Sequence, residues 1–131
     1  MTNILKTINS KENLYHLTGA TSDEISLAEK DLQLVFHKDY KEYVSNFGFI
    51  SYGSHELTGI CSFPRLNVVN VTQEERKYNP SIPQQYYVIE QTNIEGIVVW
   101  QSPEGNVYQS TPDHPLKQIA TSLSEYIEYF D

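Results

Sequence analysis

The hydrophobic pattern of this chain changes its period near Gly53, and that change constrains the fold more than any other feature. Before Gly53, apolar residues recur three and four positions apart, which is the spacing of one face of a helix. After it, Gly and Pro separate apolar pieces that are too short for helices, which is typical of strands and loops. At 131 residues the chain has the length of one domain, so we expect a single domain over residues 1–131.

The first part of the chain predicts two helices. The segment T-S-D-E at residues 21–24 matches a capping box, in which the Thr21 hydroxyl accepts the amide of Glu24 while the Glu24 side chain reaches back. A second helix should end at Gly48, a residue that tolerates the left-handed conformation of a helix stop. The apolar faces of the two helices consist of Ile25, Ala28 and Leu32, and of Tyr40, Tyr43, Val44 and Phe47.

The second part predicts three strands, over residues 86–90, 97–101 and 106–109, because these runs are β-branched or aromatic. Ser102-Pro103-Glu104-Gly105 should form the turn of an antiparallel hairpin. Residues 67–78 predict a short helix opened by Thr72, and a second capping box at Ser122 opens a closing helix. We therefore expect an α+β fold, with an antiparallel sheet covered on one side by N-terminal helices and a closing C-terminal helix.

The chain is acidic, and the charge is uneven. Nine Lys and Arg against seventeen Asp and Glu give a net charge of −8, which repels phosphate backbones and anionic lipid headgroups. Residues 1–50 carry 5 basic and 7 acidic residues, a net −2, while residues 51–131 carry 4 and 10, a net −6. We expect no direct nucleic acid as a partner; a basic protein would be attracted, although solubility alone also explains such a charge.

Location and chemistry are predicted mostly by what is missing. A lone cysteine, the absence of a signal-peptide core and an apolar run of only four residues, 97–100, predict a cytoplasmic protein that does not span a membrane. No phosphate-loop motif occurs, and Cys61 has no nucleophile signature, so it is interpreted as a small buried residue. The adjacent pairs His55-Glu56 and Asp113-His114 are interpreted as solvated loop residues. We therefore predict no catalytic residues, no metal site and no cofactor.

Acidic and aromatic residues cluster in the strand region, where they are candidates for contact with a partner. Strand alternation places Tyr86, Val88 and Glu90 on one face. Protein interfaces are enriched in Tyr and Trp, and acids around them suit a basic partner. Ordinary half-buried strand aromatics remain the competing interpretation. The predicted contact residues are Glu90, Glu95, Trp100, Glu104 and Tyr108.

Several segments occur together in a recognisable order: Thr21–Ile25 with Ala28–Leu32, Phe36–Val44 with Phe47-Gly48, Glu56–Gly59, Gly105–Tyr108 and Ser122–Ile127. In this order they resemble the SUKH superfamily of Smi-Knr-type domains, and the resemblance covers about residues 15 to 130. One departure is His37, where the family usually has Pro before the second helix.

The resemblance implies a SUKH-like α+β fold and, as for most bacterial members, an immunity protein that binds and neutralises a cognate toxin, often a nuclease. It carries over no catalytic residues, so we expect a non-enzymatic protein whose partner is a basic toxin. Fungal members suggest an alternative, a regulatory scaffold that binds host proteins of cell-wall synthesis. A small hydrolase that uses two of the glutamates is a third hypothesis.

Overall fold

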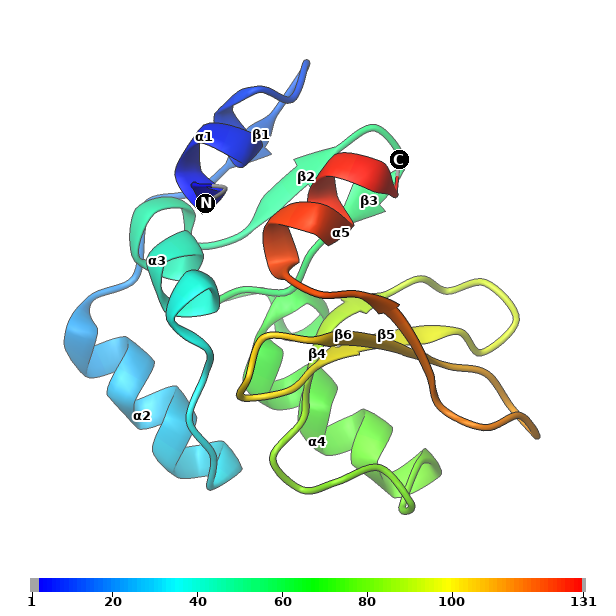
Figure 1. Ribbon diagram of the computed structural model, residues 1–131. Helices are drawn as coiled ribbons and strands as arrows, with labels where there is room; N and C mark the ends of the chain where they lie inside the picture. The colour runs from blue at the N-terminus through cyan, green and yellow to red at the C-terminus, as the bar shows by residue number, and fades with distance from the viewer. Residues whose placement is uncertain (1–2, 131) are drawn as a thin grey trace.

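Helices cover both faces of a four-stranded antiparallel sheet in the computed structural model, which describes residues 3–130 (Figure 1). The elements in chain order are α1 (Ile4–Asn9), β1 (Tyr15–His16), α2 (Ser22–Leu32), α3 (Lys38–Phe47), β2 (Ile50–Tyr52), β3 (His55–Glu56), the 3-10 helix η1 (Pro64–Leu66), α4 (Val68–Tyr78), β4 (Tyr87–Gln91), β5 (Val98–Gln101), β6 (Val107–Ser110), β7 (Lys117–Ala120) and α5 (Leu123–Tyr129). The expected α+β class with antiparallel pairing and a closing C-terminal helix is confirmed.

The two predicted N-terminal helices form where their end signals lie. Thr21 caps α2 with both halves of the capping box, since its hydroxyl accepts the Glu24 amide and the Glu24 carboxylate accepts the Thr21 amide. Helix α3 ends at Gly48, whose φ of +70° suits glycine. At the start of α3, His37 takes the N-cap position, and its ring nitrogen lies 3.2 Å from the Asp39 amide, which donates to it. A side-chain cap therefore opens α3 at this position.

Helix α4 is longer than the sequence predicted. It begins at Val68, where the Asn67 side chain accepts the Val69 amide at 2.9 Å, and not at Thr72. Thr72 lies inside the helix and is fully buried, and its hydroxyl accepts the backbone amide of Val88 at 3.0 Å. The helix starts early because Val68 and Val71 are buried in the interior, which outweighs the weak helix preference of valine.

The four-stranded sheet has the order β4-β5-β6-β7 with antiparallel neighbours. The predicted turn closes the β5–β6 hairpin, where the Gly105 amide donates to the Ser102 carbonyl at 2.9 Å and Gly105 has a φ of +100°. One expectation was wrong: the sheet is covered on both faces, not on one. Val88, Val98 and Trp100 pack with Val71 of α4, whereas the other face joins the main core through Tyr87, Ile89, Val99 and Val107.

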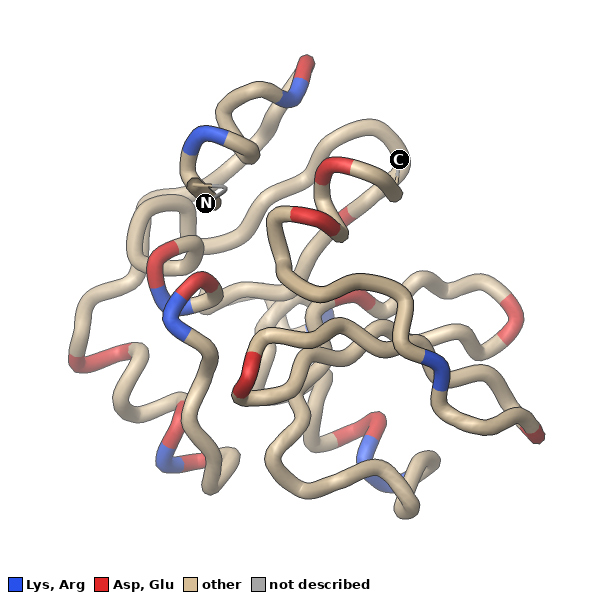
Figure 2. The backbone as a smooth tube through the Cα atoms, in the orientation of Figure 1, with Lys and Arg blue, Asp and Glu red and all other residues tan. Residues whose placement is uncertain are grey.

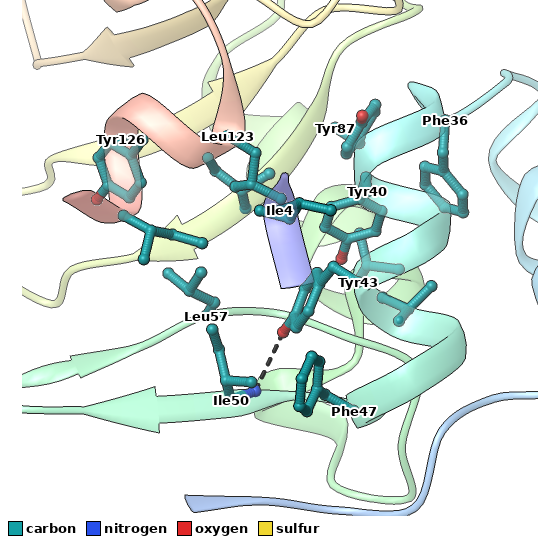
Figure 3. Packing of buried hydrophobic residues seen from close by; sticks show 14 of the residues in the cluster. Ile4, Phe36, Tyr40, Tyr43, Phe47, Ile50, Leu57, Tyr87, Leu123 and Tyr126 are labelled. Atoms are coloured by element: carbon teal, nitrogen blue, oxygen red, sulfur yellow. Dashed lines mark hydrogen bonds between the residues drawn. The ribbon is translucent and has the colours of Figure 1, made fainter. Parts of the chain in front are cut away.

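The main core lies between this sheet and helices α1, α3 and α5, and a second sheet, β1-β2-β3, borders it (Figure 3). Tyr43 links its layers: its hydroxyl donates to the Thr58 carbonyl at 2.6 Å and accepts the Ile50 amide at 3.1 Å.

Helix α5 packs against α1 and β7. Ser122 caps α5 by accepting the Glu125 amide, but the Glu125 carboxylate binds the amide of Thr121 rather than that of Ser122.

Candidate functional site

The five residues that the sequence suggested for partner contact do not form one surface. Glu90 and Trp100 are 4% and 0% exposed, so their side chains lie in the interior. Glu95 and Glu104 are exposed, and Tyr108 is half-buried. Any contact surface built from this set is therefore limited to the last three residues.

Trp100 is buried because α4 covers the sheet face that was expected to be open. Its ring packs with Val71, Val88 and Val98, and its indole nitrogen donates to the Ser110 hydroxyl at 2.9 Å. Satisfying the indole N–H is the usual requirement for a buried Trp. The residue therefore acts as a core side chain.

Glu90 is buried because a β-bulge breaks the predicted alternation of β4. The register shifts between Val88 and Glu90, and the carboxylate accepts the Tyr126 hydroxyl of α5 at 2.5 Å. The same carboxylate lies 2.9 Å from Nδ1 of His55. The interpretation of His55 as a solvated loop residue was therefore wrong, since its side chain is only 15% exposed and is bound to Glu90. The sequence contained no signal for this cluster, because His55 and Tyr126 lie 35 and 36 positions from Glu90.

Glu95 and Glu104 lie at opposite ends of the four-stranded sheet. Glu95 is in the loop between β4 and β5, and Glu104 is in the turn between β5 and β6. Consecutive loops of an antiparallel meander emerge at opposite ends. Figure 2 shows acidic positions on both loops, and others spread over the helices, so the negative charge is distributed rather than gathered in one patch.

At one end, Glu104 joins two tyrosines in what we name the hairpin patch, Tyr86, Glu104 and Tyr108. The rings of Tyr86 and Tyr108 stack with centroids 5.1 Å apart and planes 24° apart. Burial raises the pKa of Tyr86 to about 12, and Tyr108 and the charge of Glu104 add to this effect. Both tyrosines are half-buried beside an exposed carboxylate, a combination typical of protein interfaces.

A second surface, which the sequence reasoning missed, is a groove of about 500 Å³ between α2 and the start of α4; we name it the α2 groove. One stripe of α2 forms a wall with Glu24, Leu27, Ala28 and Asp31. Ile60, Cys61 and Val69 lie opposite. The signal was present in the sequence, because residues 24, 27, 28 and 31 share a helical face, but Leu27 was not in the predicted apolar set.

The lone cysteine lies in this groove and is partly exposed, rather than buried as the sequence suggested. Its thiol lies 3.8 Å from the Phe63 carbonyl. Partial burial raises the pKa of the Cys61 thiol, which keeps it protonated and weakly nucleophilic at neutral pH.

A second hollow, of about 400 Å³, is lined by Lys11, Tyr52 and His55 among others. The Lys11 ammonium lies 5.1 Å from the centre of the Tyr52 ring, and the His55 ring stacks on Tyr52 at 5.3 Å.

Within residues 3–130, no group of three or more His, Cys, Asp or Glu is placed to hold a metal ion. Over the same residues, no helix has the length and apolar character that crossing a bilayer requires.

Comparison with known families gives a match over nearly the whole sequence. Residues 1–130 match the family model SUKH_5, described as SMI1-KNR4 cell-wall. A search of curated proteins finds no match.

Proposed function

This chain belongs to the SUKH_5 family of SMI1-KNR4 domains, and from that premise we propose that it is an immunity protein that binds a cognate toxin and blocks it by occlusion. The toxin is proposed to be basic, and a nuclease is the class that fits best. The family match over residues 1–130 is the observation that carries this proposal.

The charge of the chain supports a basic partner. A nuclease holds phosphates in a basic groove, and a protein with a net charge of −8 competes for such a groove and accelerates the encounter through its long-range field. Exposed carboxylates lie at both ends of the sheet, at Glu95 and Glu104, so the field does not depend on one patch. Non-enzymatic action is part of the proposal, because occlusion requires no reacting group.

We retain the hairpin patch as an anchor; Glu104 and Tyr108 belong to the predicted contact set, and the structure adds Tyr86. Tyr86 and Tyr108 offer a stacked aromatic surface, and Glu104 offers a carboxylate beside it. Aromatic anchors with a charged rim are frequent among the residues that dominate binding energy. Glu95 is proposed as a second, separate contact or as a steering charge.

The test is rescue of cells that express a toxin domain encoded beside this chain. Wild-type protein should restore growth and should co-purify with the toxin domain. The double variant Glu95→Lys and Glu104→Lys should weaken rescue, whereas Glu128→Lys, an exposed acid on α5, should not. Failure of the wild-type chain to bind any adjacent toxin would contradict the proposal, and full rescue by the double variant would remove these two residues from the contact surface.

A regulatory scaffold is the second candidate, because the matched family model is described by the term cell-wall. A scaffold would bind proteins of the host cell in the absence of any toxin. Deletion of the gene for this chain, in a strain without a toxin gene, distinguishes the two functions. An altered cell wall would favour the scaffold, and an unchanged wall would favour immunity.

A further inference from the structure

The α2 groove combines an exposed leucine, half-buried apolar side chains and two carboxylates. Leu27 is 58% exposed although it stands on the wall of a hollow of about 500 Å³. Ala28 lies behind it and is buried, and Ile60 and Val69 are half-buried on the other side. The groove thus offers an apolar surface large enough to receive one or two side chains.

Charge makes this surface selective. Glu24 and Asp31 are the charged residues of its lining, and both are exposed acids. They stand seven residues apart on one face of α2, which is about 10 Å along the helix axis at 1.5 Å per residue. An apolar centre between two carboxylates favours an apolar side chain flanked by two cations.

The spacing indicates the form of the occupant. A helix that runs alongside α2 repeats its side chains with the same period, so cations at positions i and i+7 meet Glu24 and Asp31 together. Apolar residues at i+3 and i+4 of that helix then face Leu27 and Ile60. Binding of an amphipathic helix in an apolar groove is a common mode of recognition.

We propose that the α2 groove receives a basic amphipathic helix of the partner protein, with an apolar side chain against Leu27 and two cations on Glu24 and Asp31. This inference rests on the proposed function for the identity of the partner, the toxin. It differs from the hairpin patch in position, since it is built from α2, residues 60–62 and the start of α4.

The lone cysteine provides a reporter, because Cys61 lines the groove and is partly exposed. The probe is a synthetic alanine-based helix with Arg at i and i+7 and Leu at i+3 and i+4. A copy with Glu in place of Arg is the control peptide. The rate of maleimide alkylation of Cys61 in the intact chain is measured with and without each peptide, at a mildly alkaline pH that partly ionises the thiol.

The Arg peptide at about 1 mM should reduce the alkylation rate to half or less, which corresponds to a Kd of about 1 mM or tighter. The Glu peptide should leave the rate unchanged. Asp31→Lys should abolish the protection, and Glu128→Lys, with the same change of net charge, should retain it. Each variant is compared with its own rate without peptide, since the new charge alters the reactivity of the thiol. Absence of protection by the Arg peptide, or equal protection in Asp31→Lys, would overturn the inference.

Toxin binding separates this inference from the proposed function. Leu27→Ser and Asp31→Lys change exposed side chains that make no capping bond, so both variants should fold, which circular dichroism checks. If the wild-type chain binds the toxin and these variants bind equally well, the groove is not the docking site but the immunity function stands. If the wild-type chain binds no toxin, the immunity function is wrong, and the peptide measurement alone decides the chemistry of the groove.

Discussion

The hydroxyl of Tyr126 donates a hydrogen bond of 2.5 Å to the carboxylate of Glu90, and this bond joins the last helix to the second half of the bulged strand β4. His55 of β3 lies on the same carboxylate, at 2.9 Å. One acidic side chain thus connects the closing helix and both sheets. A residue that the sequence assigned to partner contact therefore has a structural role.

Tyr126→Phe should destabilise the fold by about 1.5–3 kcal/mol, because it removes a buried hydrogen bond to a carboxylate. The midpoint of urea unfolding should fall with an unchanged slope. Tyr129→Phe is the matched control, since Tyr129 is 71% exposed and should change stability by less than about 0.5 kcal/mol. Equal midpoints for the two variants would show that the Tyr126–Glu90 bond does not stabilise the fold.

Tyr43→Phe should cost roughly 1–3 kcal/mol of stability, because the fully buried Ile50 amide loses its acceptor and the Thr58 carbonyl loses a donor. The measurement is again urea unfolding. Tyr78→Phe, at a residue 72% exposed, is the control. A wild-type midpoint for Tyr43→Phe would mean that other groups satisfy these two backbone atoms.

Gly59→Ala should be far more damaging than Gly53→Ala. A methyl group on Gly59 would overlap the carbonyl oxygen of Gly48, which accepts the Ile60 amide at 2.9 Å. Separation of these backbones should cost at least about 3 kcal/mol, the upper range for overpacking.

Gly53 meets nothing within 4 Å, so its alanine variant bears only the strain of a φ of +54°, about 1–2 kcal/mol. Thermal unfolding followed by circular dichroism ranks the two variants. The reverse order of stability would contradict the close approach of Gly48 and Gly59.

Alkaline titration should show tyrosines that ionise late. Burial raises the pKa of Tyr86 to about 12 and raises the pKa values of Tyr40, Tyr43, Tyr87 and Tyr126 as well. Because the folded state holds these protons more tightly than the unfolded chain, where the pKa is about 10, their contribution to stability is complete below that pH. It is lost as the pH rises toward the folded-state values.

The ultraviolet absorbance of phenolate should therefore rise in a late step that coincides with loss of the circular dichroism signal. Tyr86→Phe should remove part of the phenolate signal near pH 12. Ionisation of all ten tyrosines of the sequence in one wave near pH 10, with the fold intact, would contradict the burial of these hydroxyls.

Local signals in the sequence predicted the elements whose boundaries they set. The capping box at Thr21 and the glycine stop at Gly48 mark the ends of real helices, and the turn at 102–105 closes a real hairpin. Each of these signals joins residues at most four positions apart, so it can be recognised in the sequence alone. The strands β1 and β3 have two residues each, which is too few for any periodic pattern.

The exposure of the candidate contact residues was harder to predict, because it depends on elements distant in sequence. Trp100 is buried by α4, and the bulge next to Ile89 turns Glu90 toward His55 and Tyr126. Neither the cover by α4 nor the bulge can be recognised in the sequence of the strand itself. Glu104 and Tyr108 lie near each other because they stand four residues apart on one hairpin, and their contact with a partner stays a prediction.

Helix α1 packs against α5, so the side chains of residues 4–9 are fully packed only when residues 123–129 are in place. Ile4 and Ile8 belong to the same buried cluster as Leu123 and Ile127. Ile4 and Ile8 therefore reach their fully packed state only after α1 has met α5. Contacts between segments this distant in sequence require a long stretch of chain to close on itself, which slows folding.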